Sequence, residues 1–540
     1  MRTIGRRQQQ QLDASIGQNF GIPVRVLMEY AGMAVAREAK RMLSEGMGCQ
    51  PVRILCGHGQ NGGDALVAAR LLHADGYAVR CHLDGFPAGT PEFADQLSTV
   101  RALGIACENT WTLDTEPGLI IDGIYGTGFQ ADRPLPKSVA IFLSQIREAR
   151  NSGARVLAID VPSGLETDTA RYADLAVQAD RTVTFLFPKT GLVSDPGRDL
   201  AGEIIVDRLG LSEEALIRLL DAVEPPTLHS EWIDDPMIRR LAPVRPRRMH
   251  KGQGGRALLI AGSPGYGGAA LLAGEAALRS GAGLVNLLTD DSQISTALCR
   301  IPEAMVTGLH GSEDAEAVRK LDHLISLHPA AMGIGPGIGL TRQSASLLAA
   351  VLEKARSIVV DADALSLIAA DPDRFRSLLR ARLTDPDKQP AVLTPHPGEF
   401  ARLMPEAQAL PRHEAGRRLA ERTGSVVVLK GAATVVAAPD GRICINSTGN
   451  SGLARGGSGD VLTGLLTGIL AQGLPAFDAA LCAVYLHGLA ADLAASEDTK
   501  RTILASDVIA RFPAAFRASG WQGDPEVPGR PVPDPKYVQP

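Results

Sequence analysis

One candidate catalytic residue is a carboxylate that follows a run of glycines. The stretch from Asn450 to Gly473 reads NSGLARGGSGDVLTGLLTGILAQG, with Asp460 at the start of an apolar run of helical length. A helix N-terminus carries about half a positive charge and unpaired N–H groups, so it suits an anion such as phosphate. Asp460 would repel phosphate there, but it has a role if it takes the proton of a hydroxyl that attacks the phosphate. The alternative is a glycine-rich turn in which Asp460 caps the helix.

Four further segments of the second half place flexible or polar residues where strands are predicted to end. They are AGSPGYGGAA (261–270), GIGPGIG (333–339), TPHPGEF (394–400) and LKGAAT (429–434). Ligands of open α/β sheets bind outside the carboxyl ends of the strands. His396 stands between prolines that stiffen its loop, and Lys430 ends a strand. Taken singly, a loop histidine is more often solvated than catalytic, and the lysine fits a surface lysine at a strand end. The order and spacing of the four segments are what is specific.

Three loops of the first half each combine an acid with glycines. They are CGHGQNGGDALVAARLL (56–72), IIDGIYGTGF (120–129) and AIDVPSGLETD (158–168), which contain Asp64, Asp122 and Asp160. Three such loops at one sheet edge favour a ligand site over three unrelated helix caps. The oxygen-bearing residues Asn61, Asp122 and Ser163 would suit a hard cation rather than zinc.

The strands that must position these residues alternate with helical patterns in both halves. Apolar runs lie at 52–57, 118–123, 154–160, 181–187 and 202–207, and then at 256–262, 283–289, 330–337, 357–364, 391–396 and 425–431. Such runs separated by helices predict parallel sheets covered on both faces. The fold class is therefore α/β, with two doubly wound domains, the first a Rossmann-like three-layer sandwich. A hairpin is predicted at 434–446, around Pro-Asp-Gly.

The alternation breaks near residues 225–235, where prolines and charges gather. We therefore predict domains at 1–228 and 229–520 and a proline-rich tail at 521–540. Distinct cores on either side of the break should let each site work without the other.

Composition excludes several classes of protein. The 540 residues are 45% hydrophobic and 21% charged, with a net charge of −5, which gives no electrostatic footprint for nucleic acid. Seven scattered cysteines without a CxxC pair fit reduced thiols. The N-terminus has no apolar core of a signal peptide, and we find no apolar run of 18 residues for a membrane span. A cytoplasmic protein is expected.

The motifs of the second half together resemble one family. HKGQGG, AGSPGYGGAALLAGEAALRSGAG, GIGPG, VVDADAL, LTPHPGEFARL, LKGAATVV and NSTGNSGLARGGSGDVLTG are similar to the ADP- or ATP-dependent NAD(P)H-hydrate dehydratases, over roughly 235–515. The resemblance implies a ribokinase-like fold. It implies an ADP site at Lys430, Gly431, Ala432, Ala433, Thr434 and Gly459. It also implies substrate contacts at Ala269, Gly337, His396 and Asp460, with Asp460 as the catalytic base and Mg²⁺ beside ADP.

The first half resembles the NAD(P)H-hydrate epimerase domain, over roughly 10–215, on its loops at 56–72, 120–129 and 158–168. Gln60 stands where that family usually has asparagine. The resemblance implies potassium at Asn61, Asp122 and Ser163, and Asp160 as the catalytic acid/base. It implies substrate contacts at two segments and Asp160: Gln60, Asn61, Gly62, Gly63 and Asp64, then Gly126, Thr127, Gly128, Phe129, Gln130, Ala131 and Asp132.

These resemblances predict a bifunctional repair enzyme. One domain would interconvert the epimers of hydrated NADH and NADPH, and the other would dehydrate the S epimer with ADP, which we favour over ATP, giving AMP and phosphate. Two alternatives stay open: a ribokinase-like kinase of a small hydroxylated vitamin precursor in the second half, and a non-catalytic scaffold in the first. The expected partners are these small molecules and further copies of the chain, not nucleic acid or membranes.

Overall fold

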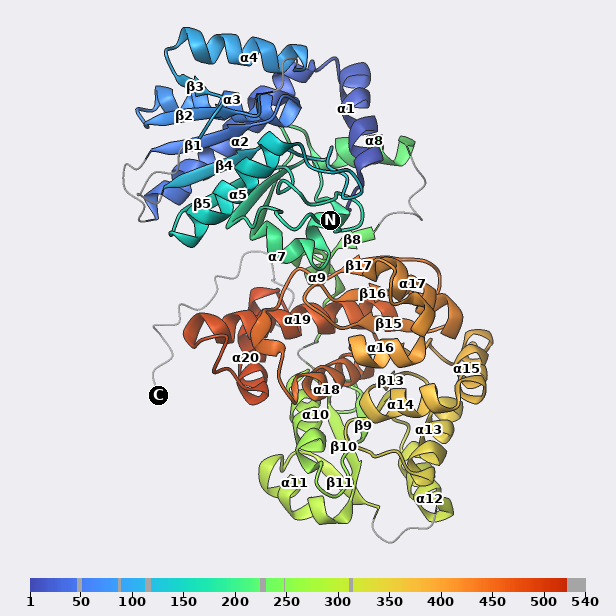
Figure 1. The fold of residues 1–540 in the computed structure, drawn as a ribbon. Coiled ribbons are helices and arrows are strands. Elements are labelled where there is room, and N and C mark those ends of the chain that lie inside the picture. The colour runs from blue at the N-terminus through green and yellow to red at the C-terminus, as the bar shows by residue number, and fades with distance from the viewer. Residues whose placement is uncertain are drawn as a thin grey trace.

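The computed structural model describes residues 1–45, 51–85, 89–111, 118–223, 230–246, 248–309 and 314–521. Two α/β units lie one above the other, each built on its own sheet (Figure 1). The predicted boundary at 228/229 falls outside the described residues, between α8 (Glu213–Val223) and β8 (Ser230–Trp232). The fold class predicted from the sequence is confirmed.

The first sheet has seven parallel strands in the order β3-β2-β1-β4-β5-β6-β7. They are β1 (Val52–Cys56), β2 (Val79–Leu83), β3 (Ala106–Glu108), β4 (Leu119–Gly123), β5 (Arg155–Ile159), β6 (Arg181–Phe185) and β7 (Glu203–Asp207). The helices are α1 (Arg6–Phe20), α2 (Val24–Ser44), α3 (Gln60–Ala74), α4 (Pro91–Ala102), α5 (Lys137–Asn151), α6 (Thr190–Val193), α7 (Gly197–Ala201) and α8. Apolar residues of α2 and α3 cover one face of the sheet, and α5 covers the other. The strand order reverses between β1 and β4, where α/β sheets bind ligands.

The second sheet has ten strands in the order β11-β10-β9-β12-β13-β14-β15-β16-β17-β8. The strands are β9 (Arg256–Ile260), β10 (Leu284–Thr289), β11 (Met305–Gly308), β12 (Ala331–Ile334), β13 (Ile358–Val360), β14 (Val392–Leu393), β15 (Val426–Leu429), β16 (Val435–Ala437) and β17 (Ile443–Ile445), with β8 at the edge. Strands β9 to β15 are parallel, and the predicted hairpin is confirmed as antiparallel β16 and β17, with Val435 opposite Ile445. The short strands β3, β8 and β11 had no apolar run that would have revealed them.

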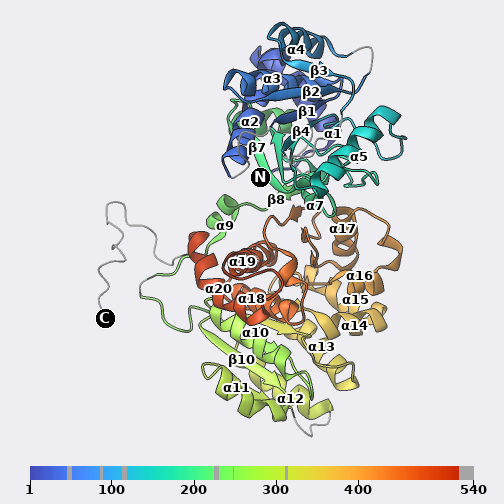
Figure 2. The ribbon, with the colours of Figure 1, turned by 60° about the vertical axis from the view of Figure 1, so that its left-hand side comes forward.

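Helices cover both faces of the second sheet (Figure 2). One face carries α10 (Gly267–Arg279), α18 (Ser458–Ala471), α19 (Ala476–Glu497) and α20 (Ala505–Ala518), and the other carries α12 (Asp314–Ile325), α13 (Arg342–Lys354), α14 (Ala362–Ala370) and α15 (Pro372–Ala381). Shorter helices are α9 (Asp235–Leu241), α11 (Ile294–Arg300) and α16 (Pro397–Leu403), and α17 (Arg412–Thr423) packs near the hairpin.

Two glycines let α18 lie directly against α10. A Cβ added at Gly464 would overlap the carbonyl oxygen of Ala273, and one at Gly468 would overlap the hydroxyl of Ser280. The spacing of four residues places both glycines on one helix face, so the two backbones touch along it. This contact fixes the N-terminal end of α18, which carries Asp460.

Helix α19 is long and apolar enough to cross a membrane by length and composition, so the expectation that no such run exists was wrong. Its mean hydropathy is 1.4 over the most apolar window, and 72% of that window is buried within the protein. The helix packs against α18 and α20 in the largest apolar cluster of the second domain. Its apolar surface is therefore that of a core helix.

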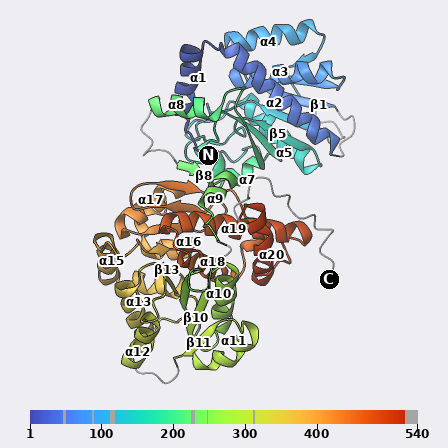
Figure 3. The ribbon, with the colours of Figure 1, turned by 180° about the vertical axis from the view of Figure 1, so that it is seen from behind.

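The two units are connected by a joint of packed, hydrogen-bonded segments rather than by a simple linker (Figure 3). The joint consists of the first residues of the chain, the segment at 188–195 and β8. The Thr3 N–H donates to the Ser230 carbonyl at 2.8 Å, the Ile4 N–H donates to the Pro188 carbonyl, and the Thr190 N–H donates to the Ile4 carbonyl, both at 3.0 Å. The chain near its N-terminus thus bridges β8 and the segment before α6. Because Val193 is fully buried in a second-domain cluster, the expectation of two distinct cores needs correction.

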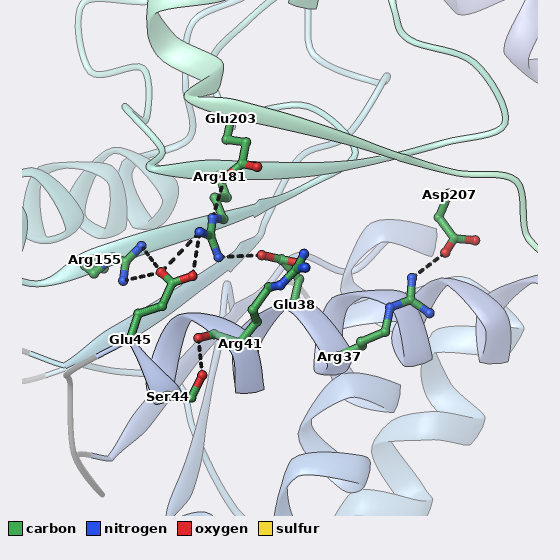
Figure 4. A network of polar contacts seen from close by, with 9 residues as sticks. All are labelled: Arg37, Glu38, Arg41, Ser44, Glu45, Arg155, Arg181, Glu203 and Asp207. Atoms are coloured by element: carbon green, nitrogen blue, oxygen red, sulfur yellow. Dashed lines mark hydrogen bonds and ion pairs between the residues drawn. The ribbon is translucent and has the colours of Figure 1, made fainter. Parts of the chain in front are cut away.

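The edge of the first sheet where β5, β6 and β7 begin is held by a network of ion pairs (Figure 4). Arg181 donates to Glu38 at 2.6 Å, to Glu45 at 2.8 Å and to Glu203 at 2.7 Å. Arg155 reaches the same Glu45 at 3.2 Å. These contacts join the end of α2 to three strands on the side of the sheet opposite its carboxyl ends.

Candidate active sites

The first domain contains a cavity of about 310 Å³ at the carboxyl ends of β1, β4 and β5. It is lined by seven of the predicted residues: Gln60, Asn61, Asp64, Gly126, Thr127, Gly128 and Asp160. Residues from α1 and α2 close the cavity on another side, among them Gln9, Asp13 and Met28. The three acidic loops predicted to share one site therefore meet around one hollow.

Asp160 is held in place by a buried lysine that the sequence did not reveal. Lys189 is fully buried, and its ammonium donates to Asp160 Oδ1 at 2.5 Å, to Thr184 Oγ1 at 3.1 Å and to the Phe185 carbonyl at 2.8 Å. Asp160 also adopts a left-handed conformation, with φ of 62°, which costs free energy for any residue but glycine. The strained backbone and the ion pair together aim the carboxylate into the cavity.

Two neighbouring carboxyl groups retain their protons more readily than usual. Burial, together with the charges of Asp160 and Asp13, raises the pKa of Asp64 well above its ordinary range. Burial also raises the pKa of Asp13 to about 6, although a hydrogen bond from Gln9 and the charge of Lys189 oppose the shift. The cavity therefore combines an ion-paired carboxylate with carboxyl groups that can carry a proton near neutral pH.

Asp122, Ser163 and Asn61 lie beside this cavity and offer oxygen atoms. The fully buried Asp122 accepts from the Ser163 hydroxyl at 2.6 Å and from the Ser163 N–H at 2.8 Å. Burial raises its pKa to about 6, while the hydrogen bonds from Ser163 oppose that shift. Asn61 Oδ1 faces Gly126, and within the described residues its buried Nδ2 has no hydrogen-bond partner. The oxygen atoms of these three side chains are the kind of ligand that a hard cation takes.

Gly62 and Gly63 do not line the cavity; they lie in the first turns of α3. A Cβ at Gly62 would overlap the Gly57 carbonyl, and one at Gly63 would overlap Met28. Asp64 is buried one turn into the helix, whose N-cap is Gly59, so the alternative that Asp64 caps the helix is wrong.

Residues 129–132, the second half of the other predicted segment, do not line the cavity. Phe129 packs near Tyr125, with 5.9 Å between ring centroids. The Ala131 N–H donates to Glu166, and the exposed Asp132 pairs with Arg171 at 3.0 Å. Gln130 belongs to the same loop and does not line the cavity.

In the second domain, Asp460 occupies the first turn of α18, whose N-cap is Gly457 with φ of 94°. Asp460 is thus the third helical residue and not the cap. Burial raises its pKa to about 6; the charges of Asp361 and Asp363 add to the shift, and Lys430 opposes it. Asp460 can therefore accept a proton near neutral pH.

Lys430 lies in a cluster of acids at the carboxyl ends of β13, β14 and β15. Its ammonium donates to Asp361 Oδ1 at 2.8 Å and lies 3.9 Å from Glu399 Oε2. Thr463 of α18 donates to the other oxygen of Asp361 at 2.8 Å. Burial disfavours the charge of Lys430, but Asp361 and Glu399 outweigh it and raise the pKa of the lysine. The cation is held in place for an anionic ligand.

His396 caps α16 through its Nδ1, which accepts from the Gly398 N–H at 3.0 Å. Its Nε2 lies 3.3 Å from Glu399, and the side chain is about half exposed (51%). The histidine is thus oriented by its backbone contacts and linked through Glu399 to Lys430.

The other predicted residues of this domain surround the same sheet edge. A Cβ added at Gly337 would lie 3.4 Å from that of Ala269, so these two residues are neighbours. A Cβ added at Gly459 would lie 3.4 Å from Lys430 Nζ and 3.5 Å from Asp361 Oδ2, so this glycine faces the ion pair. The loop of Lys430, Gly431, Ala432, Ala433 and Thr434 is closed by Thr434, whose hydroxyl donates to the Gly431 carbonyl at 3.1 Å.

Comparison with known proteins agrees with this geometry. Residues 257–513 match the family described as NAD(P)H-hydrate dehydratase, and residues 24–191 match the YjeF-related protein N-terminus. A bifunctional NAD(P)H-hydrate repair enzyme of Moorella thermoacetica is 35% identical over 531 residues, which cover 94% of this chain and 95% of the relative. The chain belongs to the family of bifunctional NAD(P)H-hydrate repair enzymes. In this family its first domain is the epimerase domain and its second the dehydratase domain.

Another member of the family and a solved structure are also similar to this chain. The repair enzyme of Escherichia coli is 36% identical over 466 residues, covering 84% of this chain and 83% of the relative. The crystal structure of an ADP/ATP-dependent NAD(P)H-hydrate dehydratase from Bacillus subtilis, crystallised with ATP and Mg²⁺, is 33% identical; the match covers 54% of this chain and 99% of that one, with a TM-score of 0.45.

Residue patterns alone missed three charged groups near the candidate catalytic carboxylates: Asp361, Lys189 and Asp13. Asp361 ends a strand in the motif VVDADAL, which supports the resemblance but does not by itself give the residue a role. Lys189 follows the predicted strand at 181–187, and a lysine after a strand resembles many surface lysines. Asp13 lies in α1, far from any glycine loop.

Proposed function

We propose that the first domain interconverts the R and S hydrates of NADH and NADPH, and that the second dehydrates the S hydrate with ADP. The domains would span 1–228 and 229–520. The proposal is carried by one observation: each candidate site gathers a lysine–aspartate ion pair and further carboxyl groups at the carboxyl ends of parallel strands.

In the first site, Asp160 acts as the acid/base. The hydrated carbon bears both the ring nitrogen and a hydroxyl group. Proton transfer lets either its C–N bond break, which opens the ring, or its C–O bond break, which releases water, and re-forming the same bond on the other face inverts the carbon. Lys189 keeps Asp160 in place, while Asp64 and Asp13 supply groups that hold a proton near neutral pH. The retained acid/base set argues against a mere scaffold.

Potassium in this site is supported by the oxygen atoms of Asn61, Asp122 and Ser163. Bound there, the cation would supply positive charge beside the buried Asp122 and attract the phosphate groups of the substrate. The seven residues that line the cavity would contact the substrate, and the loop of Phe129 to Asp132 would border it.

In the second site, Asp460 takes the proton of the hydroxyl group as its oxygen attacks the terminal phosphoryl group of ADP, and AMP leaves. The ring nitrogen then expels phosphate, and loss of a proton from the neighbouring ring carbon restores the dihydropyridine. Lys430 and the N–H groups at the start of α18 stabilise the charge of the transferring group. Mg²⁺ bound with the nucleotide would neutralise further phosphate charge.

The remaining residues of the second site have binding roles in the proposal. Lys430 to Thr434 and Gly459 hold ADP, and Ala269, Gly337 and His396 contact the hydrate. A loop that lacks the lysine–serine pair of a Walker motif must contact phosphates mainly through its backbone.

The test follows the return of NADH absorbance from a mixture of both hydrate epimers. With ADP and Mg²⁺, the protein should convert both epimers completely; without nucleotide, it should convert neither. Parallel curves with ATP test the nucleotide preference. Consumption of nucleotide by simple hydroxylated vitamin precursors, with none by the hydrate, would favour a kinase instead.

A further inference from the structure

The segment after β6 connects the two candidate sites. It starts at Lys189, which holds Asp160, and continues through α6 to Asp195. Within it, the fully buried Val193 packs in the same apolar cluster as Leu429 and Ala433 of the second domain. Leu429 directly precedes the loop proposed to bind ADP, and Ala433 belongs to that loop. In all three ribbon views, α7, which follows the segment, lies at the junction between the domains (Figures 1–3).

Arg412 contacts the same loop from the other side. This first residue of α17 donates from Nη2 to the Leu429 carbonyl at 3.1 Å and to the Lys430 carbonyl at 2.8 Å. Its guanidinium lies against Gly431, where an added Cβ would overlap Nη2. The loop therefore depends on Arg412 for its backbone position and on glycine for room.

The first domain supplies a carboxylate to this arginine. Asp195 Oδ2 lies 3.9 Å from Arg412 Nε, and within the described residues that nitrogen has no hydrogen-bond partner. Both side chains are largely covered, with exposed fractions of 32% for Asp195 and 19% for Arg412. Burial lowers the pKa of Arg412, and the charge of Asp195 opposes that effect. A guanidinium placed in such surroundings needs the negative charge.

We propose that Asp195 and Arg412 are positioning residues for the nucleotide loop, so that the epimerase domain completes the nucleotide site of the dehydratase domain. Docking of Val193 and Asp195 holds Arg412 on the carbonyl groups of Leu429 and Lys430. The N–H groups of the loop are then presented in one arrangement to the phosphates. This inference rests on the proposed role of residues 430–434 in binding ADP.

The test measures dehydration of the S hydrate by full-length variants, with the KM for ADP, the KM for the hydrate and kcat determined separately. Asp195→Asn should raise the KM for ADP about three- to tenfold, and Arg412→Gln by at least as much, with the KM for the hydrate unchanged. The double variant should be no worse than Arg412→Gln alone, because both changes break one chain of contacts. Asp199→Asn, an exposed residue of α7, is the matched control and should change nothing.

A third variant separates this inference from the proposed function. Lys430→Met alters the loop itself and should raise the KM for ADP. If it does so while Asp195→Asn and Arg412→Gln do not, the coupling is refuted and the nucleotide site stands. If none of the three changes the KM for ADP, the loop is not the nucleotide site and both ideas fail. Equal rises in both KM values, with a lower melting temperature, would mean general destabilisation and also refute the positioning role.

Discussion

The two domains use the same pair of residue types in opposite ways. In the epimerase domain, Lys189 contacts the candidate catalytic residue Asp160 itself. In the dehydratase domain, Lys430 contacts Asp361, and Asp460 stays outside that pair. Each sheet thus ends in a lysine–aspartate ion pair, but only in the first does the pair contain the candidate catalytic group.

In the proposed mechanism, this difference follows from the chemical groups that each reaction brings into its site. Phosphoryl transfer brings anionic oxygens into the site, so a lysine kept charged by Asp361 serves the phosphate, and a separate base serves the hydroxyl group. Epimerisation returns the substrate to its own composition, so one fixed carboxylate that gives and takes a proton is enough. The same ion pair therefore anchors a ligand-binding cation in one site and a catalytic anion in the other.

The comparison is tested most strongly by removing the separate base. Asp460→Asn should lower the rate of dehydration by about 10²–10⁴-fold, because general-base assistance is lost. Nucleotide binding, measured by calorimetry, should persist because Lys430 and its partner are untouched. Asp373→Asn, an exposed aspartate in the first turn of α15, is the control. A loss of less than about tenfold contradicts the role of Asp460.

Replacing Asp160, the carboxylate held by Lys189, should lower the rate of its own reaction by less, but in a distinctive way. Asp160→Asn should slow epimerisation about 10²-fold, because Asp64 and Asp13 still carry protons near the substrate. With mixed epimers, NADH absorbance should rise quickly and then crawl at the rate of spontaneous epimerisation. The variant Asp174→Asn, at an exposed position, should behave as the parent. Full conversion by Asp160→Asn at the parent rate would show that the first domain acts by other residues.

The pH dependence of dehydration should test Asp460 as the base. The pKa of Asp460 is raised to about 6, and a base works only when ionised. The kcat/KM for dehydration should therefore fall about tenfold between about pH 7 and about pH 5. The residual activity of Asp460→Asn should lack this decline. A profile that is flat across this range in the parent protein would rule out Asp460 as the titrating base.

The smallest effect on catalysis is expected for changes to Arg181, at the edge of the first sheet opposite its candidate site. Arg181→Ala removes three ion pairs, including the 2.6 Å contact with the buried Glu38, which among the described residues keeps only its pair with Arg41. The loss should lower the free energy of unfolding by about 2–3 kcal/mol. Both reaction rates should stay within about twofold of the parent. Arg37→Ala, whose exposed side chain pairs with Asp207, should lower stability by less than about 1 kcal/mol. A thermal melt of each variant measures the difference.

Apolar runs and glycine loops predicted the strands and most of the residues around each site. The spacing of Gly464 and Gly468 fits the close contact of α18 with α10, since only a small residue permits it. Lys189 and Asp195 could not be predicted in the same way, because their roles come from contacts with residues distant in sequence. Val193 likewise looked like part of the first core and packs in the second. The cytoplasmic location and the homo-oligomer stay predictions.

The joint between the domains also sets an order of events during synthesis. A ribosome delivers the chain from its N-terminal end, and all strands of the first sheet precede β8. The partner of β8 is β17, which is made much later, and the other buried residues in the apolar cluster of Val193 all lie beyond β8 in the sequence. Until β17 is made, β8 lacks its partner strand and Val193 lacks its buried apolar neighbours. We expect a chaperone to bind the nascent chain at these two places.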